Sequence, residues 1–130
     1  MGREHEPAQT QVLDASAVLA WLQQETGADA VDPLLDGGVM SAANWAEVLQ
    51  KAQRAGVPAT ATALSLKALG VRVEPVIEED AAAIVRWWFE DSALSLGDRC
   101  CLALAERLGG RAVTAEGAWQ NLNTEVLVIR

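Results

Sequence analysis

Four carboxylate side chains could do chemistry together if the fold brought them to one place: Asp14, Glu47, Asp98 and Glu116. Two unit charges about 4 Å apart repel by roughly 4 kcal/mol at an effective dielectric of 20, and a divalent ion removes that cost. A set of oxygen ligands suits Mg²⁺ or Mn²⁺ rather than Zn²⁺. A metal held in this way activates water and neutralises charge on a phosphodiester. The residue types therefore indicate metal-dependent hydrolysis without a covalent nucleophile.

Each of these acids also has a simpler interpretation when it is taken alone. Asp14 or Ser16 can simply cap a helix, and Glu116 at a helix start suits the helix dipole. Asp98 can complete a capping box with the serine three residues before it. Glu47 can form a surface ion pair with Lys51, four residues on. The metal-site hypothesis therefore depends on all four acids converging.

Strands and helices alternate along the whole sequence. Short apolar or β-branched runs predict strands at 12–13, 39–40, 71–76, 111–114 and 126–129. Helical spacing, with glycine stops, predicts helices at 17–24, 28–35, 43–55, 59–69, 78–89, 95–108 and 116–121. This order predicts an α/β three-layer sandwich, with a mostly parallel central sheet flanked by helices. Because ligands bind at the carboxyl ends of parallel strands, the acids stand at suitable positions.

Composition limits the class of protein. The 130 residues, 51% of them hydrophobic, fit a flexible tail over 1–10 and a single domain over 11–130. No apolar run reaches the roughly 20 residues of a membrane span, and the polar start lacks a signal peptide, so we expect a cytoplasmic protein. The adjacent Cys100 and Cys101 are expected to be core residues. A net charge of −8 argues against a general nucleic-acid binder more than against a metal nuclease.

Four segments carry a resemblance to a known family. They are VLDASAVLA at 12–20, SAANWAEV at 41–48, LSLGDRCCLALA at 94–105 and VTAEGAW at 113–119. In this order they resemble the acidic motifs of PIN domains, and the resemblance extends over about 11–130. Within that class the chain looks like the VapC toxins of type II toxin–antitoxin systems.

The resemblance implies an Mg²⁺- or Mn²⁺-dependent endoribonuclease that cleaves RNA by attack of water on phosphorus. Asp14 and Asp98 correspond to the principal metal ligands, and Glu47 corresponds to a further site carboxylate that binds metal directly or through water. Ser16 and Thr114 correspond to supporting hydroxyls that orient carboxylates or waters. These assignments come from motif position in the family.

One acidic position departs from the family pattern. Glu116 stands where the family usually has aspartate, and Gly117 stands where a basic residue is common. The longer side chain favours either coordination through water or a weaker second metal. A second hypothesis is therefore a catalytically weak or inactive PIN-like module whose acids dock a basic partner.

Partners follow from the same resemblance. VapC-like toxins are homodimers, silenced by an antitoxin whose C-terminal segment enters the active-site groove. Helices at 28–35 and 43–55 would frame such a groove. Arg99 and Lys51 are possible RNA contacts, with solvated surface charge as the alternative. Trp45 and Trp119 lie beside site motifs, where core packing and base stacking are both open.

Overall fold

The computed structural model describes residues 9–130 and contains one sheet of five strands in the order β3-β2-β1-β4-β5. The strands are β1 (Gln11–Leu13), β2 (Val39–Ser41), β3 (Arg72–Glu74), β4 (Arg111–Thr114) and β5 (Val126–Val128). Every pairing between neighbours is parallel. The predicted α/β class is confirmed, and the described sheet is parallel throughout.

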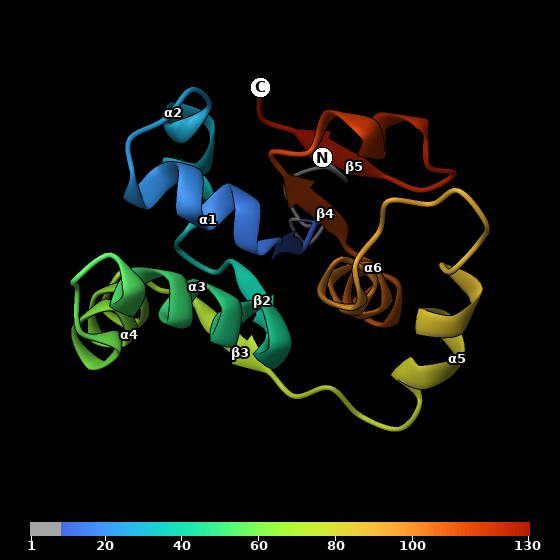
Figure 1. Cartoon of the computed structure of the whole chain (residues 1–130), viewed down its shortest axis with the longest axis horizontal. Helices are drawn as coiled ribbons and strands as arrows, with labels where there is room; N and C mark the ends of the chain where they lie inside the picture. The colour runs from blue at the N-terminus through green and yellow to red at the C-terminus, as the bar shows by residue number, and fades with distance from the viewer. Residues whose placement is uncertain (1–8) are drawn as a thin grey trace, which may run out of the picture.

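Helices cover both faces of this sheet (Figure 1). The first group comprises α1 (Ala15–Leu22), α2 (Ala28–Val31), the 3₁₀ turn η2 (Asp32–Leu34), α3 (Ala42–Arg54) and α4 (Ala59–Ala68). The second comprises α5 (Asp80–Arg86), α6 (Leu96–Leu108) and the 3₁₀ turn η3 (Gly117–Asn121). Figure 1 shows α1 to α4 on one side of the sheet and α5 with α6 on the other. Helices α3 and α6 nevertheless contact each other, which matters for the site described below.

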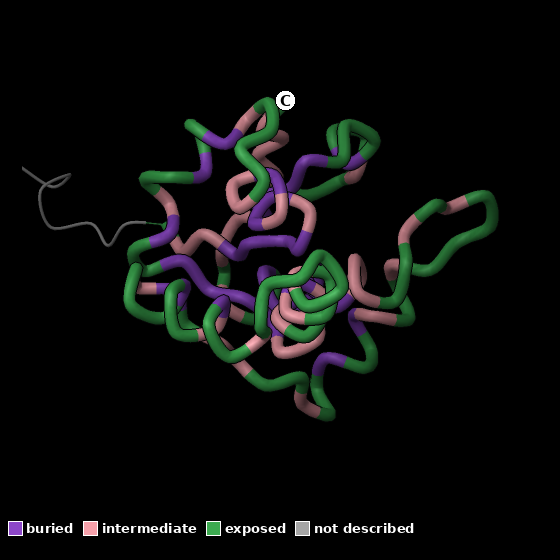
Figure 2. Tube along the Cα trace, turned by 60° about the vertical axis from the view of Figure 1, so that its left-hand side comes forward, coloured by how far each residue is buried: buried purple, intermediate pink, exposed green. Residues whose placement is uncertain are grey.

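Alternation along the short strands builds two hydrophobic cores. Leu13, Met40 and Val113 point to the face covered by α1 to α4, where they pack with Val18 and Val48. The residue before each of these three strand residues points to the opposite face, against α6. Successive strand residues face opposite sides of a sheet, so each central strand contributes to both cores. Figure 2 shows the buried residues at the centre of the molecule and exposed ones on the outer segments.

Two helices are shorter than the sequence pattern predicts. The predicted helix 28–35 divides into α2 and η2, because Pro33 has no N–H to donate and lies in the first turn of the 3₁₀ segment. The predicted helix 78–89 forms only as α5, whose last turn ends at Arg86. The predicted helix 116–121 is the 3₁₀ turn η3. Strand β3 is likewise shorter than the predicted 71–76, since it ends before Pro75.

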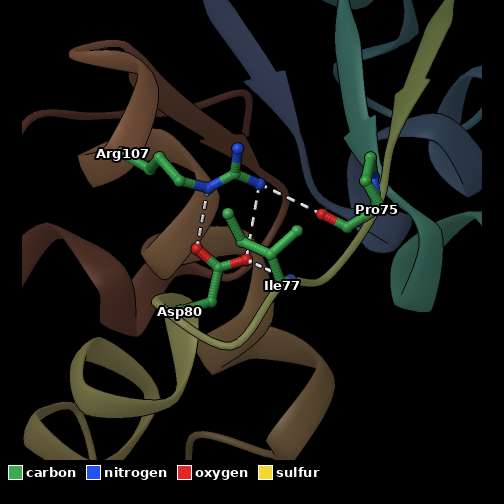
Figure 3. Close-up of polar contacts among 4 residues, drawn as sticks. All are labelled: Pro75, Ile77, Asp80 and Arg107. Atoms are coloured by element: carbon green, nitrogen blue, oxygen red, sulfur yellow. Dashed lines mark hydrogen bonds and ion pairs between the residues drawn. The ribbon is translucent and has the colours of Figure 1, made fainter.

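A half-buried ion pair attaches α5 to α6 (Figure 3). Arg107 Nε donates to Asp80 Oδ1 at 2.8 Å, and Arg107 Nη2 donates to the Pro75 carbonyl at 3.0 Å. The backbone N–H of Ile77 donates to Asp80 Oδ2 at 3.0 Å. Asp80 is 4% exposed, so these bonds offset the loss of its hydration. Together they connect the end of β3 to α5 and α6.

Several sequence expectations concern the chain's start and its thiols. The predicted tail falls mostly on residues 1–8, which lie outside the described residues, but Thr10 accepts a backbone bond from Arg111 at 2.8 Å. Thr10 therefore continues the alignment of β1 with β4.

Cys100 and Cys101 are buried and unbridged, as expected of core residues. Over 9–130, no helix has both the length and the hydropathy to cross a membrane.

Candidate functional site

Asp14 lies at the carboxyl end of β1, where the strand passes into α1. Its backbone N–H bonds to the Val113 carbonyl at 2.8 Å, so the register with β4 continues to this point. Asp14 occupies the N-cap position of α1, yet its side chain makes no capping hydrogen bond. The simple capping interpretation of Asp14 is therefore wrong. The side chain is 2% exposed and turns to other partners.

Two hydroxyl groups hold the Asp14 carboxylate. Ser16 Oγ donates to Asp14 Oδ2 at 2.7 Å, and Thr114 Oγ1 donates to the same oxygen at 3.0 Å. Each hydroxyl oxygen also accepts a backbone N–H at 3.0 Å, from Ala115 onto Ser16 and from Glu116 onto Thr114. Because an ionised carboxylate can only accept, the hydroxyl groups are the donors in these two bonds. Ser16 and Thr114 thus both contact the Asp14 carboxylate through Oδ2.

Burial raises the pKa of Asp14 to about 6. The hydrogen bonds from Ser16 and Thr114 lower the pKa, and the negative charges of Asp98 and Glu47 add to the rise, so that about 6 is the net result. Desolvation is the largest of these effects because a buried carboxylate loses its hydration. The sheet and helices therefore bring three of the four predicted acids close enough to affect one another electrostatically.

Asp98 reaches this site from the first turn of α6. Ser95 and Asp98 form a capping box, in which Ser95 Oγ accepts from the Asp98 N–H at 3.1 Å and Asp98 Oδ2 accepts from the Ser95 N–H at 2.8 Å. The predicted capping role is therefore confirmed, and it fixes the Asp98 side chain at the helix start. The same geometry leaves Asp98 on the wall of a pocket that Glu116 also lines.

Glu47 comes to the site from α3 and is held by a residue that the sequence analysis did not single out. Asn44, on the same helix, donates from Nδ2 to Glu47 Oε1 at 3.1 Å and to the Gly97 carbonyl at 3.0 Å. Within the described chain Glu47 makes no ion pair with Lys51, so that interpretation is wrong. Spacing could have identified Asn44, because residues three apart lie on one helix face.

Glu116 shares a pocket with Asp98. The pocket has a volume of about 380 Å³, and its wall includes Phe89, Asp91, Leu94, Asp98, Glu116 and Leu122. Glu116 is exposed and is not among the groups that shift the pKa of Asp14. The structure thus assembles two overlapping sets of acids, with Asp98 common to both.

The donor set fits a hard divalent cation. Each of Asp14, Glu47 and Asp98 accepts side-chain or backbone bonds on one carboxylate oxygen, and the other oxygen accepts none from residues 9–130. Carboxylate oxygens are the ligands that Mg²⁺ and Mn²⁺ prefer. In the described part of the chain, no three His, Cys, Asp or Glu side chains are arranged so that together they could hold a metal ion. Coordination by Asp14, Glu47 and Asp98 together would therefore require their side chains to move.

Two aromatic and two basic side chains near the motifs take different positions. Trp119 is 2% exposed and packs in the core beside α6, which excludes base stacking in this structure, whereas Trp45 is half-buried beneath Lys67. Arg99 Nη1 donates to the Ile84 carbonyl at 3.0 Å, so this side chain packs between α6 and α5. Lys51 is exposed on α3.

Comparisons with known proteins agree with this geometry. The family model described as PIN domain matches residues 12–123. A solved chain described as "Toxin-antitoxin complex from Klebsiella pneumoniae" superposes with a TM-score of 0.77 at 16% identity, over 93% of this chain and 98% of that one. No curated protein sequence matches the chain. At this identity, the likeness to the solved structure concerns the fold.

Proposed function

Because the chain belongs to the PIN-domain family, whose members are generally nucleases, we propose that it is an Mg²⁺- or Mn²⁺-dependent endoribonuclease. The observation that supports this most strongly is the Asp14 carboxylate, which is buried, held by two hydroxyls and exposed to the charges of Glu47 and Asp98. A structural role alone does not account for a buried carboxylate without a basic partner, since such burial destabilises the fold.

The metal would be held by Asp14, Asp98 and Glu47, with Glu116 at the edge of the adjoining pocket. When bound, such an ion lowers the pKa of water and neutralises charge on a phosphodiester. Ser16 and Thr114 keep Asp14 in place, and Ser95 keeps Asp98 in place. The chain's own contribution is thus orientation of fixed oxygens. Lys51, which is exposed on α3, would contact RNA phosphate, whereas Arg99 would first have to release the Ile84 carbonyl.

An RNA cleavage assay tests the proposed enzyme. Asp14→Asn and Asp98→Asn should each lower the rate by at least about 100-fold, because loss of groups that merely support metal ligands already costs 10- to 100-fold. Addition of a chelator should abolish cleavage by the wild-type chain. Asp29→Asn, an exposed acid on α2, is the matched control and should cleave as wild type does. Wild-type rates in both site variants would refute the assignment.

The biological role that we infer is that of a toxin silenced by a cognate antitoxin. The structural neighbour is described as a toxin–antitoxin complex, which supports this role through the fold. A shallow apolar pocket between α1 and the α3–α4 pair, which includes Leu19, Leu22 and Val57, could accept a helix from such a partner. Co-purification with the product of the adjacent small gene should yield a complex whose RNA cleavage is inhibited. Failure of that product to bind or inhibit would refute the toxin role.

We also propose that the chain forms a homodimer. Helix α5 and the segment after it expose the apolar side chains Val85, Trp88 and Phe89, and Val85 and Trp88 are 69% and 61% exposed. Such side chains are enriched where proteins associate. Light scattering should give twice the mass of one chain, and Trp88→Glu should give a monomer. A monomeric wild type would exclude this assembly.

The acidity of the pocket favours a second candidate, a non-catalytic module that docks a basic partner. Asp91, Asp98 and Glu116 all line the pocket, and the chain carries a net charge of −8. Titration with Mn²⁺ by calorimetry discriminates between the two functions. Binding that is lost in Asp98→Asn supports the enzyme, and no binding at millimolar concentration supports the docking module.

A further inference from the structure

Asn44 is fully buried on α3, one helical turn before Glu47. Its amide Nδ2 lies 3.1 Å from Glu47 Oε1 and 3.0 Å from the Gly97 carbonyl. The two N–H bonds of the amide therefore meet two acceptors, one on α3 and one on α6. The reversed amide would place its oxygen against both acceptors, so the geometry fixes the orientation of the group.

The rest of the Asn44 side chain is difficult to explain by stability. Its Oδ1 is buried and has no hydrogen-bond partner in the described part of the chain. A buried acceptor without a donor destabilises a fold, and an apolar side chain of the same shape avoids that penalty. The unpaired Oδ1 is therefore a cost of placing an amide here, and the two N–H bonds to Glu47 and to the Gly97 carbonyl are the contacts that offset it.

Gly97 leaves space for the same carboxylate. A Cβ atom on Gly97 would overlap Glu47 Oε1, and it would lie 3.1 Å from Glu47 Cδ and 3.6 Å from Asn44 Nδ2. Gly97 stands in the first turn of α6 with an ordinary helical backbone, so no unusual φ requires a glycine there. The requirement is therefore for space beside Glu47.

We propose that Asn44 is a positioning residue that holds Glu47 against the start of α6, beside Asp98, and that Gly97 provides the space this position needs. The inference rests on the proposed function, because it takes Glu47 to be one of the carboxylates that receive the ion. The Asn44 amide links α3 to α6 and thereby sets the separation between Glu47 and Asp98, which come from different helices. Without it, the Glu47 side chain is free to rotate away, and the site loses one preorganised ligand.

Calorimetric Mn²⁺ binding to the purified chain tests the role of Asn44. Asn44→Leu keeps the side-chain size but removes both donors, and it should weaken Mn²⁺ binding by about 10-fold or more, as loss of outer contacts to metal ligands does. In a Glu47→Ala background, Asn44→Leu should cause no further loss, because it acts through Glu47. Cleavage by Asn44→Leu should recover at high Mn²⁺ concentration.

Thr62→Val is the matched control. Thr62 is 4% exposed on α4, and its hydroxyl donates to the Pro58 carbonyl at 3.4 Å, far in sequence from the acids. This variant removes a buried polar group as Asn44→Leu does, yet it should bind Mn²⁺ with wild-type affinity. A comparable loss in both variants would mean that Asn44 matters only for packing.

Gly97→Ala provides an independent test that does not depend on how Asn44→Leu folds. Alanine is a better helix former than glycine, so the melting temperature should stay the same or rise. The added methyl group should nevertheless displace Glu47 and weaken Mn²⁺ binding several-fold. In the Glu47→Ala background the methyl group has no carboxylate to displace, and Gly97→Ala should have no further effect.

The outcomes separate this inference from the proposed function. If the wild-type chain binds Mn²⁺ and both Asn44→Leu and Gly97→Ala bind it with the same affinity, only the positioning role is overturned. Equal losses in the presence and absence of Glu47 also overturn it. If the wild-type chain binds no Mn²⁺, both the proposed function and this inference are overturned.

Discussion

At the scale of single residues, Asp14 carries the main electrostatic cost of the site. Its carboxylate is buried beside Glu47 and Asp98, and its contacts with Ser16 and Thr114 only partly offset the lost hydration. Functional sites commonly hold a group in its less stable charge state, because the ligand or the chemistry then stabilises it. Asp14 should therefore destabilise the metal-free chain at neutral pH.

The pH dependence of stability tests this cost. The folded-state pKa of about 6 lies above the ordinary aspartate value of 3.8, so the contribution of Asp14 to stability is fully present below about pH 4 and is lost as the pH rises through about 6. At about 1.4 kcal/mol per pKa unit, the loss approaches 3 kcal/mol. In chelator, the free energy of unfolding of Asp14→Asn minus that of wild type should therefore increase by about that amount between pH 4 and pH 8.

Urea unfolding at several pH values measures this difference. Asp29→Asn is the control, because Asp29 is exposed on α2. The free energy of unfolding of Asp29→Asn minus that of wild type should not show the change with pH that is expected for Asp14→Asn. A difference for Asp14→Asn that stays constant from pH 4 to pH 8 would show that Asp14 is ionised at the same pH in both states.

At the scale of elements, the bonds between Asp80 and Arg107 attach α5 to α6. Helix α5 has only seven residues, too few to be stable as an isolated helix. The ion pair joins it to α6 and to the end of β3, as Figure 3 shows. Beyond α5 the chain continues into the segment that supplies Phe89 and Leu94 to the pocket wall. The pair therefore also supports the pocket.

Removal of Arg107 should destabilise the chain strongly. Arg107→Met leaves the buried Asp80 carboxylate without its partner, and breaking such a pair typically costs 3–5 kcal/mol. Because the Arg107 side chain is 26% exposed, water offsets part of the loss, and we expect about 2–3 kcal/mol at pH 7. The midpoint of urea unfolding measures the effect.

Two further variants make that measurement specific. Arg86→Met breaks an exposed pair with Glu106, in which the side chains are 61% and 46% exposed, and it should change stability by less than about 1 kcal/mol. Adding Asp80→Asn to Arg107→Met should restore part of the lost stability, since it removes the unpaired charge. Equal effects of Arg107→Met and Arg86→Met would contradict a special role for the buried pair.

At the scale of the whole molecule, ion binding and folding are linked. The carboxylates of the site come from β1, α3 and α6, so an ion that joins them connects segments distant in sequence. A ligand that binds only the folded state stabilises it by about 2.7 kcal/mol at 100 times its dissociation constant. Saturating Mn²⁺ should therefore raise the melting temperature of the wild-type chain by several degrees.

Thermal unfolding with and without Mn²⁺ measures this linkage. Asp98→Asn should lose most of the increase, because it removes one of the proposed ligands. Asp29→Asn should retain the wild-type increase, since its side chain is exposed on α2. An equal increase in all three chains would place the stabilising ion somewhere other than the site.

The sequence by itself determined the class of fold. It also determined which acids stand at the end of a strand or the start of a helix. Alternating strands and helices predict a parallel α/β sandwich, since each parallel connection needs a crossover. The Ser95–Asp98 capping box is local, and it formed as predicted. Element ends were predicted less well where Pro33 and Pro75 interrupt the pattern, because local periodicity does not show where tertiary packing stops.

Only the tertiary structure decided which side chains meet. Asp14 is buried because β1 lies at the centre of the sheet order, between β2 and β4, and that order depends on pairings between distant segments. Asn44 reaches Gly97 only because α3 and α6 pack together. Glu116 was predicted from motif position and Arg99 from its place on a site helix, and the structure places Glu116 on the pocket wall and bonds Arg99 to α5. Sequence spacing fixes directions along one helix or strand, whereas contacts between elements depend on how their faces pack.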